Sequence, residues 1–403
     1  MRPTVKKQVF SGIILVSVFV LGSFAFAGCI GQEEAVFTVV GPWSGAEYEV
    51  FKPVLDAFTE KTGIAVNYTS IRAEDLATLL PAQFEAEKTP GDLLFMWAWW
   101  AKEHKDDLLD LSDIIDINDF TEVANQGMVD GAMYAAPYTG KLKPGFWYRK
   151  SFFEANGLSV PTSYAEFVSL CDKIEAIDGV ETAIASGDGV GWPLSDVTEH
   201  FLLAYGGVDL FEGLKAGTVS WTSPEVTKVF EDYLVPLIAD GHFSEPKEWT
   251  LILEDWWAGK HGLYFMGSWI TGMVEDPQDL GVFSLPEAKA FVFAGPDFFC
   301  IPKYTDNEND AKELAQFLAG AEGQKIQVAQ GGHVATHLDV KMSDYKAGVD
   351  QEVGALLEGA TTVTDLDDTI GGEFQTNFWD QLKFLWVHPE DLATVLAEIE
   401  AKA

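Results

Sequence analysis

The fold is decided by residues 36–68, which read VFTVVGPWSGAEYEVFKPVLDAFTEKTGIAVNY. The apolar run at 36–40 predicts a buried strand that ends at Gly41. Apolar residues then recur at helical spacing from Tyr48 to Phe58, which predicts a helix that ends at Gly63. Residues 64–68 predict a second strand. This strand–helix–strand order is typical of an α/β protein with a parallel sheet.

The same pattern continues outward from this stretch. Leu76 to Phe84 keep the helical period, and residues 93–97 predict a third buried strand. Ligands of parallel sheets bind at the carboxyl ends of the strands. In this chain those ends carry tryptophans, namely Trp43, Trp97, Trp99 and Trp100.

Further elements are expected along the rest of the chain, without an internal repeat or a flexible linker. Strands are predicted at 134–137, 146–148, 263–265, 280–283 and, as one long segment, 291–301. Helices are predicted at 152–156, 161–174, 195–205, 224–239, 250–258, 310–331, 349–358, 374–386 and 389–402.

Composition excludes several classes of function. The 403 residues carry 26 Lys and Arg against 63 Asp and Glu, a net charge of −37. Unaided binding to nucleic acid or anionic lipid needs clustered basic residues, so it is excluded. The acidic residues are dispersed, which favours a solvated exported surface over a surface that attracts cations.

The N-terminus predicts export. Basic residues at 2–7 precede an apolar stretch at 9–26, which is typical of a secretory signal. The stretch ends in Phe26-Ala27-Gly28-Cys29, which resembles a lipobox, so Cys29 is the predicted lipid attachment site and 1–28 the signal segment. The stretch is also long enough to remain as a membrane anchor. Either way, the remaining chain is expected on the extracellular face of the membrane. There, Cys171 and Cys300 could pair or stay as two buried thiols.

Five segments together carry a resemblance to a known family. They are FKPVLDAFTEKTGIAVNY (51–68), PGDLLFMWAWW (90–100), MYAAPYTGKLKPGFWYRKSFFEANGLSVPTSYAEF (133–167), GKHGLYFMGSW (259–269) and KELAQFLAGAEGQKIQVAQGGHVAT (312–336). Their order and spacing resemble the family 1 solute-binding proteins of ABC transporters, the group that includes maltodextrin-binding proteins.

The resemblance implies a two-lobed α/β fold of the periplasmic-binding-protein type, with hinge crossings and a ligand cleft between the lobes. Lobe one would comprise 33–142 plus 290–340, and lobe two 143–289 plus 341–403. It also implies a monomer that binds a carbohydrate, docks on permease subunits, and uses no cofactor or metal.

The chemistry of a sugar site suits this sequence. Aromatic rings pack on the flat C–H faces of sugars, and charged side chains bond strongly to hydroxyl groups. Trp43 and Ser44 lie in a loop that opens a helix, and Trp97 and Trp99 would share one face of an extended segment, with Trp100 opposed. The other expected ligand contacts are Trp192, Glu373 and, by resemblance, Tyr138, Lys141, Trp269 and Trp379.

Two alternatives remain. A glycoside-acting enzyme would need two carboxyl groups across a bond, and acidic pairs such as Asp367-Asp368 do not establish that arrangement. Nucleophile-elbow, zinc-protease and phosphate-loop motifs are absent from the sequence, so we expect no enzyme. A cation binder would place Tyr, Asp or His in the loops where this chain has Trp.

Overall fold

The computed structural model describes residues 37–403, except 190, 347 and 357–360. The predicted signal segment and Cys29 lie outside the described residues. Across the described residues, no helix is both long and apolar enough to cross a membrane.

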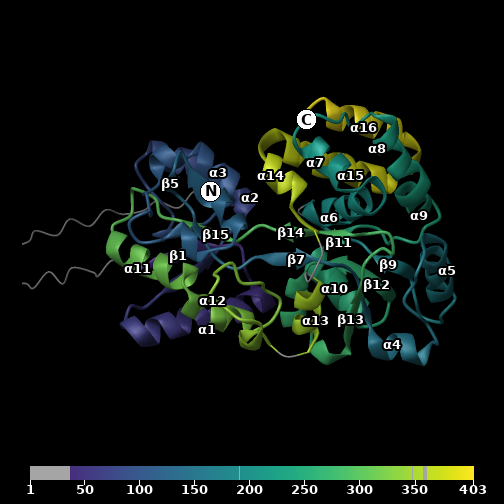
Figure 1. The fold of residues 1–403 in the computed structure, drawn as a ribbon, viewed down its shortest axis with the longest axis horizontal. Helices are drawn as coiled ribbons and strands as arrows, with labels where there is room; N and C mark the ends of the chain where they lie inside the picture. Colours follow the sequence, from purple (N-terminus) through teal and green to yellow (C-terminus); the bar gives the residue numbers. More distant parts are fainter. Residues whose placement is uncertain (1–36, 190, 347, 357–360) are drawn as a thin grey trace, which may run out of the picture. The chain divides into compact units, whose positions relative to one another are not determined.

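The first sheet contains five strands in the order β2-β1-β3-β15-β6. The strands are β1 (Thr38–Gly41), β2 (Asn67–Ser70), β3 (Leu93–Phe95), β6 (Ala136–Pro137) and β15 (Phe298–Cys300). β1 pairs in parallel with β2 and β3, as the sequence predicts, whereas β15 runs antiparallel to β3 and β6. Its helices are α1 (Gly45–Thr62), α2 (Ala73–Glu85), α3 (Ala98–Glu103), α11 (Glu308–Ala319) and α12 (Ala321–Val328) (Figure 1).

The helix α1 shows why the local sequence folds in this way. Phe51, Val54, Leu55 and Phe58 form its buried stripe, at the spacing that the sequence predicts. The helix ends at Gly63, which adopts φ 79° and donates its N–H to the carbonyl of Thr59.

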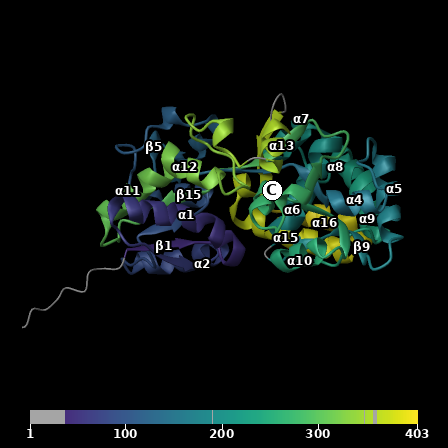
Figure 2. The same cartoon turned by 90° about the horizontal axis from the view of Figure 1, so that it is seen from below.

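The second sheet contains four strands in the order β13-β8-β12-β9. They are β8 (Gly145–Arg149), β9 (Thr182–Ala185), β12 (His261–Met266) and β13 (Leu280–Phe283). Around them lie α4 (Lys150–Ala155), α5 (Tyr164–Glu175), α6 (Trp192–Phe201), α7 (Val208–Lys215), α8 (Pro224–Val229), α9 (Val235–Ala239), α10 (Trp249–Trp257), α13 (Val349–Leu356), α14 (Leu366–Ile370), α15 (Gly372–Val387) and α16 (Leu392–Glu400). In a second view, α1 and α11 stay with the first sheet, and α4, α5 and α9 stay with the second (Figure 2).

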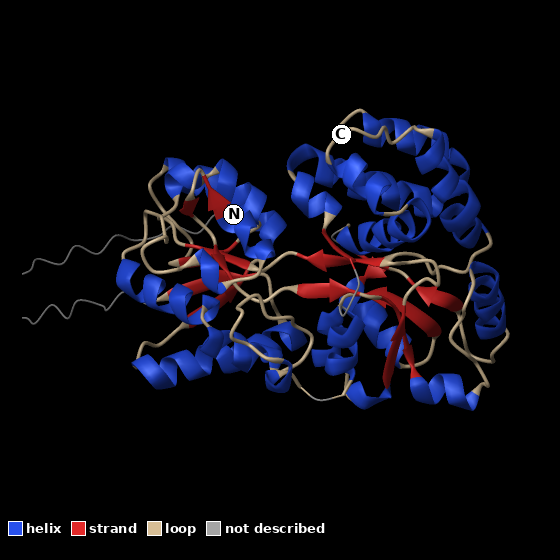
Figure 3. Ribbon diagram, in the orientation of Figure 1, coloured by secondary structure: helices blue, strands red, loops and turns tan. Residues whose placement is uncertain are grey.

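A third sheet lies where the chain passes from one of these sheets to the other (Figure 3). Its order is β16-β14-β7, with β7 (Lys141–Lys143), β14 (Ala290–Ala294) and β16 (Thr361–Thr364). β7 leads from β6 to β8, and β14 leads from β13 to β15, so these two antiparallel strands are crossings in opposite directions. The short strands β4 (Met128–Val129), β5 (Ala132–Met133), β10 (Gly187–Asp188) and β11 (Lys247–Glu248) form two small ribbons.

Three local expectations are wrong. The segment with Trp97, Trp99 and Trp100 is not an extended strand. Trp97 is extended, but α3 begins at the next residue, Ala98, so Trp99 and Trp100 are helical. The predicted strand 291–301 is two strands, β14 and β15, separated at Gly295-Pro296-Asp297. The predicted helix 310–331 is interrupted at Gly320, which is extended and separates α11 from α12.

Cys171 and Cys300 are both buried and unpaired, which decides between the two alternatives left open for them.

Candidate functional site

A cavity of about 410 Å³ lies beside the crossing strands. Its walls come from the loops after β1 and β3, the loop between β14 and β15, both ends of β7, and α14 with the residues around it. This volume is within the range of about 300–1,000 Å³ that is typical of small-molecule sites. The cavity therefore is large enough to hold a small organic ligand.

Six tryptophans line this cavity. Trp97 and Trp99 stack on each other, with ring centroids 5.6 Å apart and 16° between the planes. Trp192 and Trp269 meet edge to face at 5.5 Å. The chain has 13 tryptophans in all, so nearly half of them gather at one site. The six are Trp43, Trp97, Trp99, Trp192, Trp269 and Trp379.

Glycines allow two of these rings to approach the backbone closely. A Cβ atom at Gly191 would lie 2.6 Å from Cβ of Trp379, and one at Gly371 would lie 2.7 Å from the ring of Trp99. Both glycines also have positive φ, 104° and 67°, which other residues adopt only at a cost. The positions of Trp99 and Trp379 therefore depend on these two glycines.

A first polar group lies near Trp43. The Lys141 ammonium forms an ion pair with Asp297 and sits 5.7 Å from the Trp43 ring centroid. The carboxylate of Glu47 lies 3.8 Å from the Arg72 guanidinium. Burial raises the pKa of Glu47 to about 7, against the opposing charges of Arg72 and Lys141. Glu47 can therefore donate or accept a hydrogen bond near neutral pH.

A second polar group also lines the cavity, and Lys143 is its centre. The Lys143 ammonium pairs with both Asp196 and Asp365, and all three side chains are almost fully buried. Glu199 accepts hydrogen bonds from the backbone N–H groups of Leu366 (3.2 Å) and Asp367 (3.3 Å). This group links β7 to α6 and to the segment between β16 and α14.

Four buried acids, Asp196, Glu199, Asp365 and Asp367, and the half-buried Asp368 lie around this one lysine, and burial changes their ionisation. Burial raises the pKa of Asp196 to about 7 and that of Asp368 to about 8. Burial, together with the nearby Asp365 charge, also raises the pKa values of Glu199 and Asp367 well above their ordinary range. For Asp365, burial acts to raise the pKa, but the Lys143 charge and the hydrogen bonds from Lys143, Asp367 and the Asp368 backbone together lower it. At neutral pH, therefore, the Lys143 ammonium is not the only protonated side chain of this group, because some of the carboxyl groups also keep their protons.

The cavity contains seven of the ten residues that the sequence predicts as ligand contacts, namely the six tryptophans and Lys141. The other three lie elsewhere. Ser44 lines a neighbouring cavity. Tyr138 is fully buried and its hydroxyl donates to Oε1 of Gln327 at 2.8 Å, and Glu373 is exposed and pairs with Lys402. Glu373 lies in the first turn of α15 with an exposed side chain, whereas Trp379 on the same helix is buried.

Several cavity residues were not predicted as ligand contacts. The charged ones among them include Glu47, Arg72, Lys143, Asp297, Asp365 and Asp367. Pairing between segments far apart in the chain brings them together, as for Lys141 with Asp297 and Lys143 with Asp365. For Asp297 the sequence held a partial signal of a loop position. This residue directly follows the Gly-Pro pair that interrupts the predicted strand 291–301.

The neighbouring cavity has a volume of about 620 Å³ and shares Arg72 and Met273 with the first. Its walls are the start of α1, the α10 helix and residues 273–275. One further tryptophan, Trp257, lines it.

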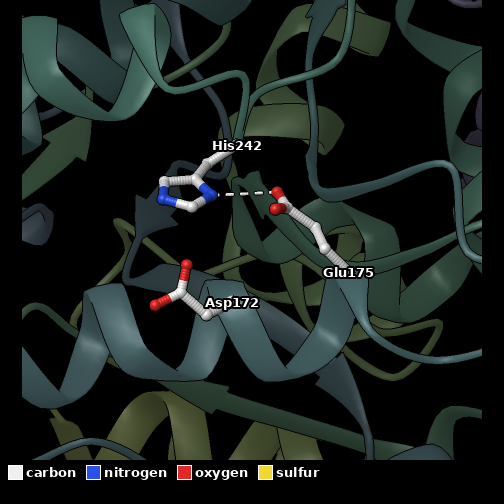
Figure 4. Close-up of side chains that lie close together, drawn as sticks. All are labelled: Asp172, Glu175 and His242. Carbon is white, nitrogen blue, oxygen red and sulfur yellow. Dashed lines mark hydrogen bonds and ion pairs between the residues drawn. The ribbon is translucent and has the colours of Figure 1, made fainter.

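A third group of side chains lies in the part of the chain around the second sheet (Figure 4). Asp172 and Glu175 of α5 lie near His242, and Glu175 Oε1 is 2.9 Å from His242 Nδ1. Glu175 also accepts a hydrogen bond from the Ala183 backbone at 3.4 Å. These contacts join α5 to β9 and to the loop after α9. We therefore assign a structural role to Glu175 and His242.

Two α/β lobes connected by crossing strands, with a cavity beside the crossings, define the class of two-lobed periplasmic binding proteins. Residues 42–325 match the bacterial extracellular solute-binding protein family, and the chain belongs to that family. It is therefore an extracellular solute-binding protein of an ABC transporter, as the resemblance in the sequence implies.

Individual relatives agree with this assignment. An uncharacterized ABC transporter extracellular-binding protein of Pyrococcus horikoshii is 46% identical over 410 residues, covering 97% of each chain. Among solved structures, a bacterial solute receptor described as exclusive for β-D-galactopyranose superposes with a TM-score of 0.79 at 19% identity, covering 91% of this chain and 97% of the other. Maltose-bound MalE3 of T. maritima gives a TM-score of 0.74 at 20% identity, covering 91% and 98%. These likenesses confirm the predicted fold class.

Proposed function

We propose that this protein binds a carbohydrate, a di- or oligosaccharide, and delivers it to the permease of its transporter. The observation that carries the proposal is the convergence of six tryptophans on one cavity. Flat aromatic faces suit the C–H faces of sugar rings, and the charged groups beside them suit hydroxyl groups. Lys141, Asp297 and Glu47 are the hydroxyl partners that we assign near Trp43.

The ligand would be enclosed by closure of two lobes. We take lobe one as 33–142 plus 290–340 and lobe two as 143–289 plus 341–403, because the chain crosses between the sheets at β7 and β14. Closure about such crossings is a hinge motion. The closed, liganded monomer is then the form that the permease subunits would receive.

The protein would be held at the outer face of the membrane by its N-terminus. The basic residues, the apolar stretch and Cys29 support a signal segment followed by a lipid attachment site. Retention of the apolar stretch as an anchor would give the same location.

A glycoside-acting enzyme is the alternative that the buried acids around Lys143 suggest. In this group, however, Asp365 pairs with Lys143, and Asp367 accepts hydrogen bonds from Ser195 and Trp379. Both carboxyl groups thus support neighbouring side chains, and we propose binding without turnover.

A ligand screen tests the proposal. Mono- to tetrasaccharides of several linkages are added one at a time, and tryptophan emission and melting temperature are recorded. A carbohydrate ligand should change the emission of the cavity tryptophans and raise the melting temperature, because it binds only the folded state. Choline and glycine betaine serve as comparison ligands, since an aromatic cavity with carboxylates also suits quaternary ammonium groups. Stabilisation by these alone would overturn the proposal, and release of reducing sugar would favour the enzyme.

A further inference from the structure

The neighbouring cavity adjoins the tryptophan-lined cavity. Arg72 and Met273 belong to the walls of both, so the two spaces meet at these side chains. Arg72 is 3.8 Å from Glu47 in the first cavity, and its side chain is 29% exposed. A ligand long enough to pass the partly exposed Arg72 side chain would therefore reach from the first cavity into the second.

An aromatic ring in this second cavity is held in a fixed position. The guanidinium of Arg149 lies 5.5 Å from the ring centroid of Trp257 and donates a hydrogen bond to the Trp257 carbonyl. Arg149 is itself 3.5 Å from Asp279. The sequence has only three arginines, and the two in the described part of the chain both serve this cavity, Arg72 as wall and Arg149 as support for Trp257.

Hydroxyl partners accompany this ring. Glu254 and Glu275 line the cavity as exposed carboxylates, and neither has an ion pair among the described residues. Ser44 lines it too, and its side chain makes no capping hydrogen bond to α1 although it precedes that helix. Glu248, by contrast, is occupied, because it caps α10 through the N–H groups of Thr250 and Leu251.

We propose that the second cavity is a subsite for the outer residues of an oligosaccharide whose inner residues lie among the six tryptophans. This inference rests on the proposed function. Trp257 supplies the stacking surface, Ser44, Glu254 and Glu275 supply hydroxyl partners, and Arg72 contacts the ligand at the junction. The preferred ligand is therefore a chain that spans both cavities.

The test uses oligosaccharides of increasing length within the linkage series that binds best, titrated into the full-length protein. Affinity should rise by about tenfold when the chain becomes long enough to reach Trp257, the gain expected from one aromatic contact and its hydrogen bonds. Ala258→Trp should remove this gain, because Ala258 is an exposed wall residue at the end of α10 and the added ring would fill the subsite. Trp257→Ala should reduce the same gain.

A matched control is Ala86→Trp, since Ala86 is also an exposed alanine at the end of a helix, α2, and lines neither cavity. It should leave the length dependence unchanged. Equal affinity for short and long sugars, or a length gain that persists in Ala258→Trp, would overturn the subsite while leaving sugar binding intact. Absence of binding by every sugar would instead overturn the proposed function.

Discussion

The indole N–H of Trp379 donates a hydrogen bond to Oδ2 of Asp367, and Ser195 Oγ donates to the same oxygen at 2.5 Å. Trp379 lies on α15 and Asp367 on α14, so the bond fixes the ring against a neighbouring helix. Asp367 in turn belongs to the buried group around Lys143. The orientation of one cavity tryptophan is thus tied to the crossing strand β7.

Replacement of Asp367 tests this tie. Asp367→Ala removes the acceptor for the indole and should weaken sugar binding by about tenfold, in line with about 1–1.5 kcal/mol for one buried hydrogen bond. Asp367→Asn keeps an acceptor oxygen and should recover most of the affinity, as measured by calorimetry. Glu373→Ala is the control on α15, because Glu373 is exposed. An equal loss in the Ala and Asn variants would show that the acceptor does not matter.

Trp97 allows a test of stacking with little risk to the fold, because it is only partly buried and precedes a short helix. Trp97→Ala should weaken sugar binding by roughly 10- to 100-fold, since it removes a ring and leaves Trp99 without its stacked neighbour. Trp97→Tyr should retain part of the affinity. Phe384→Ala, an exposed aromatic away from both cavities, provides the comparison. Unchanged affinity in Trp97→Ala would exclude this ring from the site.

Most of the aromatic part of the site was predictable, and most of its charged part was not. Trp43 and Trp97 each lie two residues past the end of a buried strand, β1 or β3, so strand order alone places them at one sheet edge. Lys143 and Asp365 meet only through the pairing of β14 with both β7 and β16, which local sequence does not encode. Trp97 and Trp99 were expected to share a face of a strand, yet they stack because Trp97 is extended and Trp99 lies in the first turn of α3.

The buried carboxyl groups predict a stability that falls as the pH rises. Folding raises the pKa of Asp196 from 3.8 to about 7, mainly by burial, with Lys143 opposing and Asp365 adding to the shift. The folded state therefore binds this proton more tightly than the unfolded state, and the resulting stabilisation is complete below about pH 4 and lost by about pH 7. The Asp196 proton alone should lower the free energy of unfolding by on the order of 2 kcal/mol between pH 5 and 8.

Denaturant unfolding at several pH values measures this effect. Asp196→Asn mimics the protonated carboxyl and should make the fall in stability shallower, and the other acids with raised pKa values account for the fall that remains. Asp380→Asn, at an exposed acid on α15, should leave the fall unchanged. A wild-type stability that rises from pH 5 to 8 would contradict the assignment.

Cys29 provides a test of the membrane tether. In a host that processes lipoproteins, the full chain should partition into the detergent phase and carry an acyl mass on Cys29. Cys29→Ser should lose that mass. If the serine variant still sediments with membranes, the apolar stretch is retained as an anchor; if the wild-type chain is fully released, both forms of tether are wrong.

Calorimetric titration of the most stabilising oligosaccharide tests the central claim most directly. We expect one binding site per chain and a negative heat-capacity change from burial of the tryptophan faces. The heat of binding should be strongly reduced in Trp269→Ala, whose ring lines the cavity. Binding of equal strength in that variant, or heat from choline or glycine betaine but from no sugar, would contradict a carbohydrate site among these tryptophans.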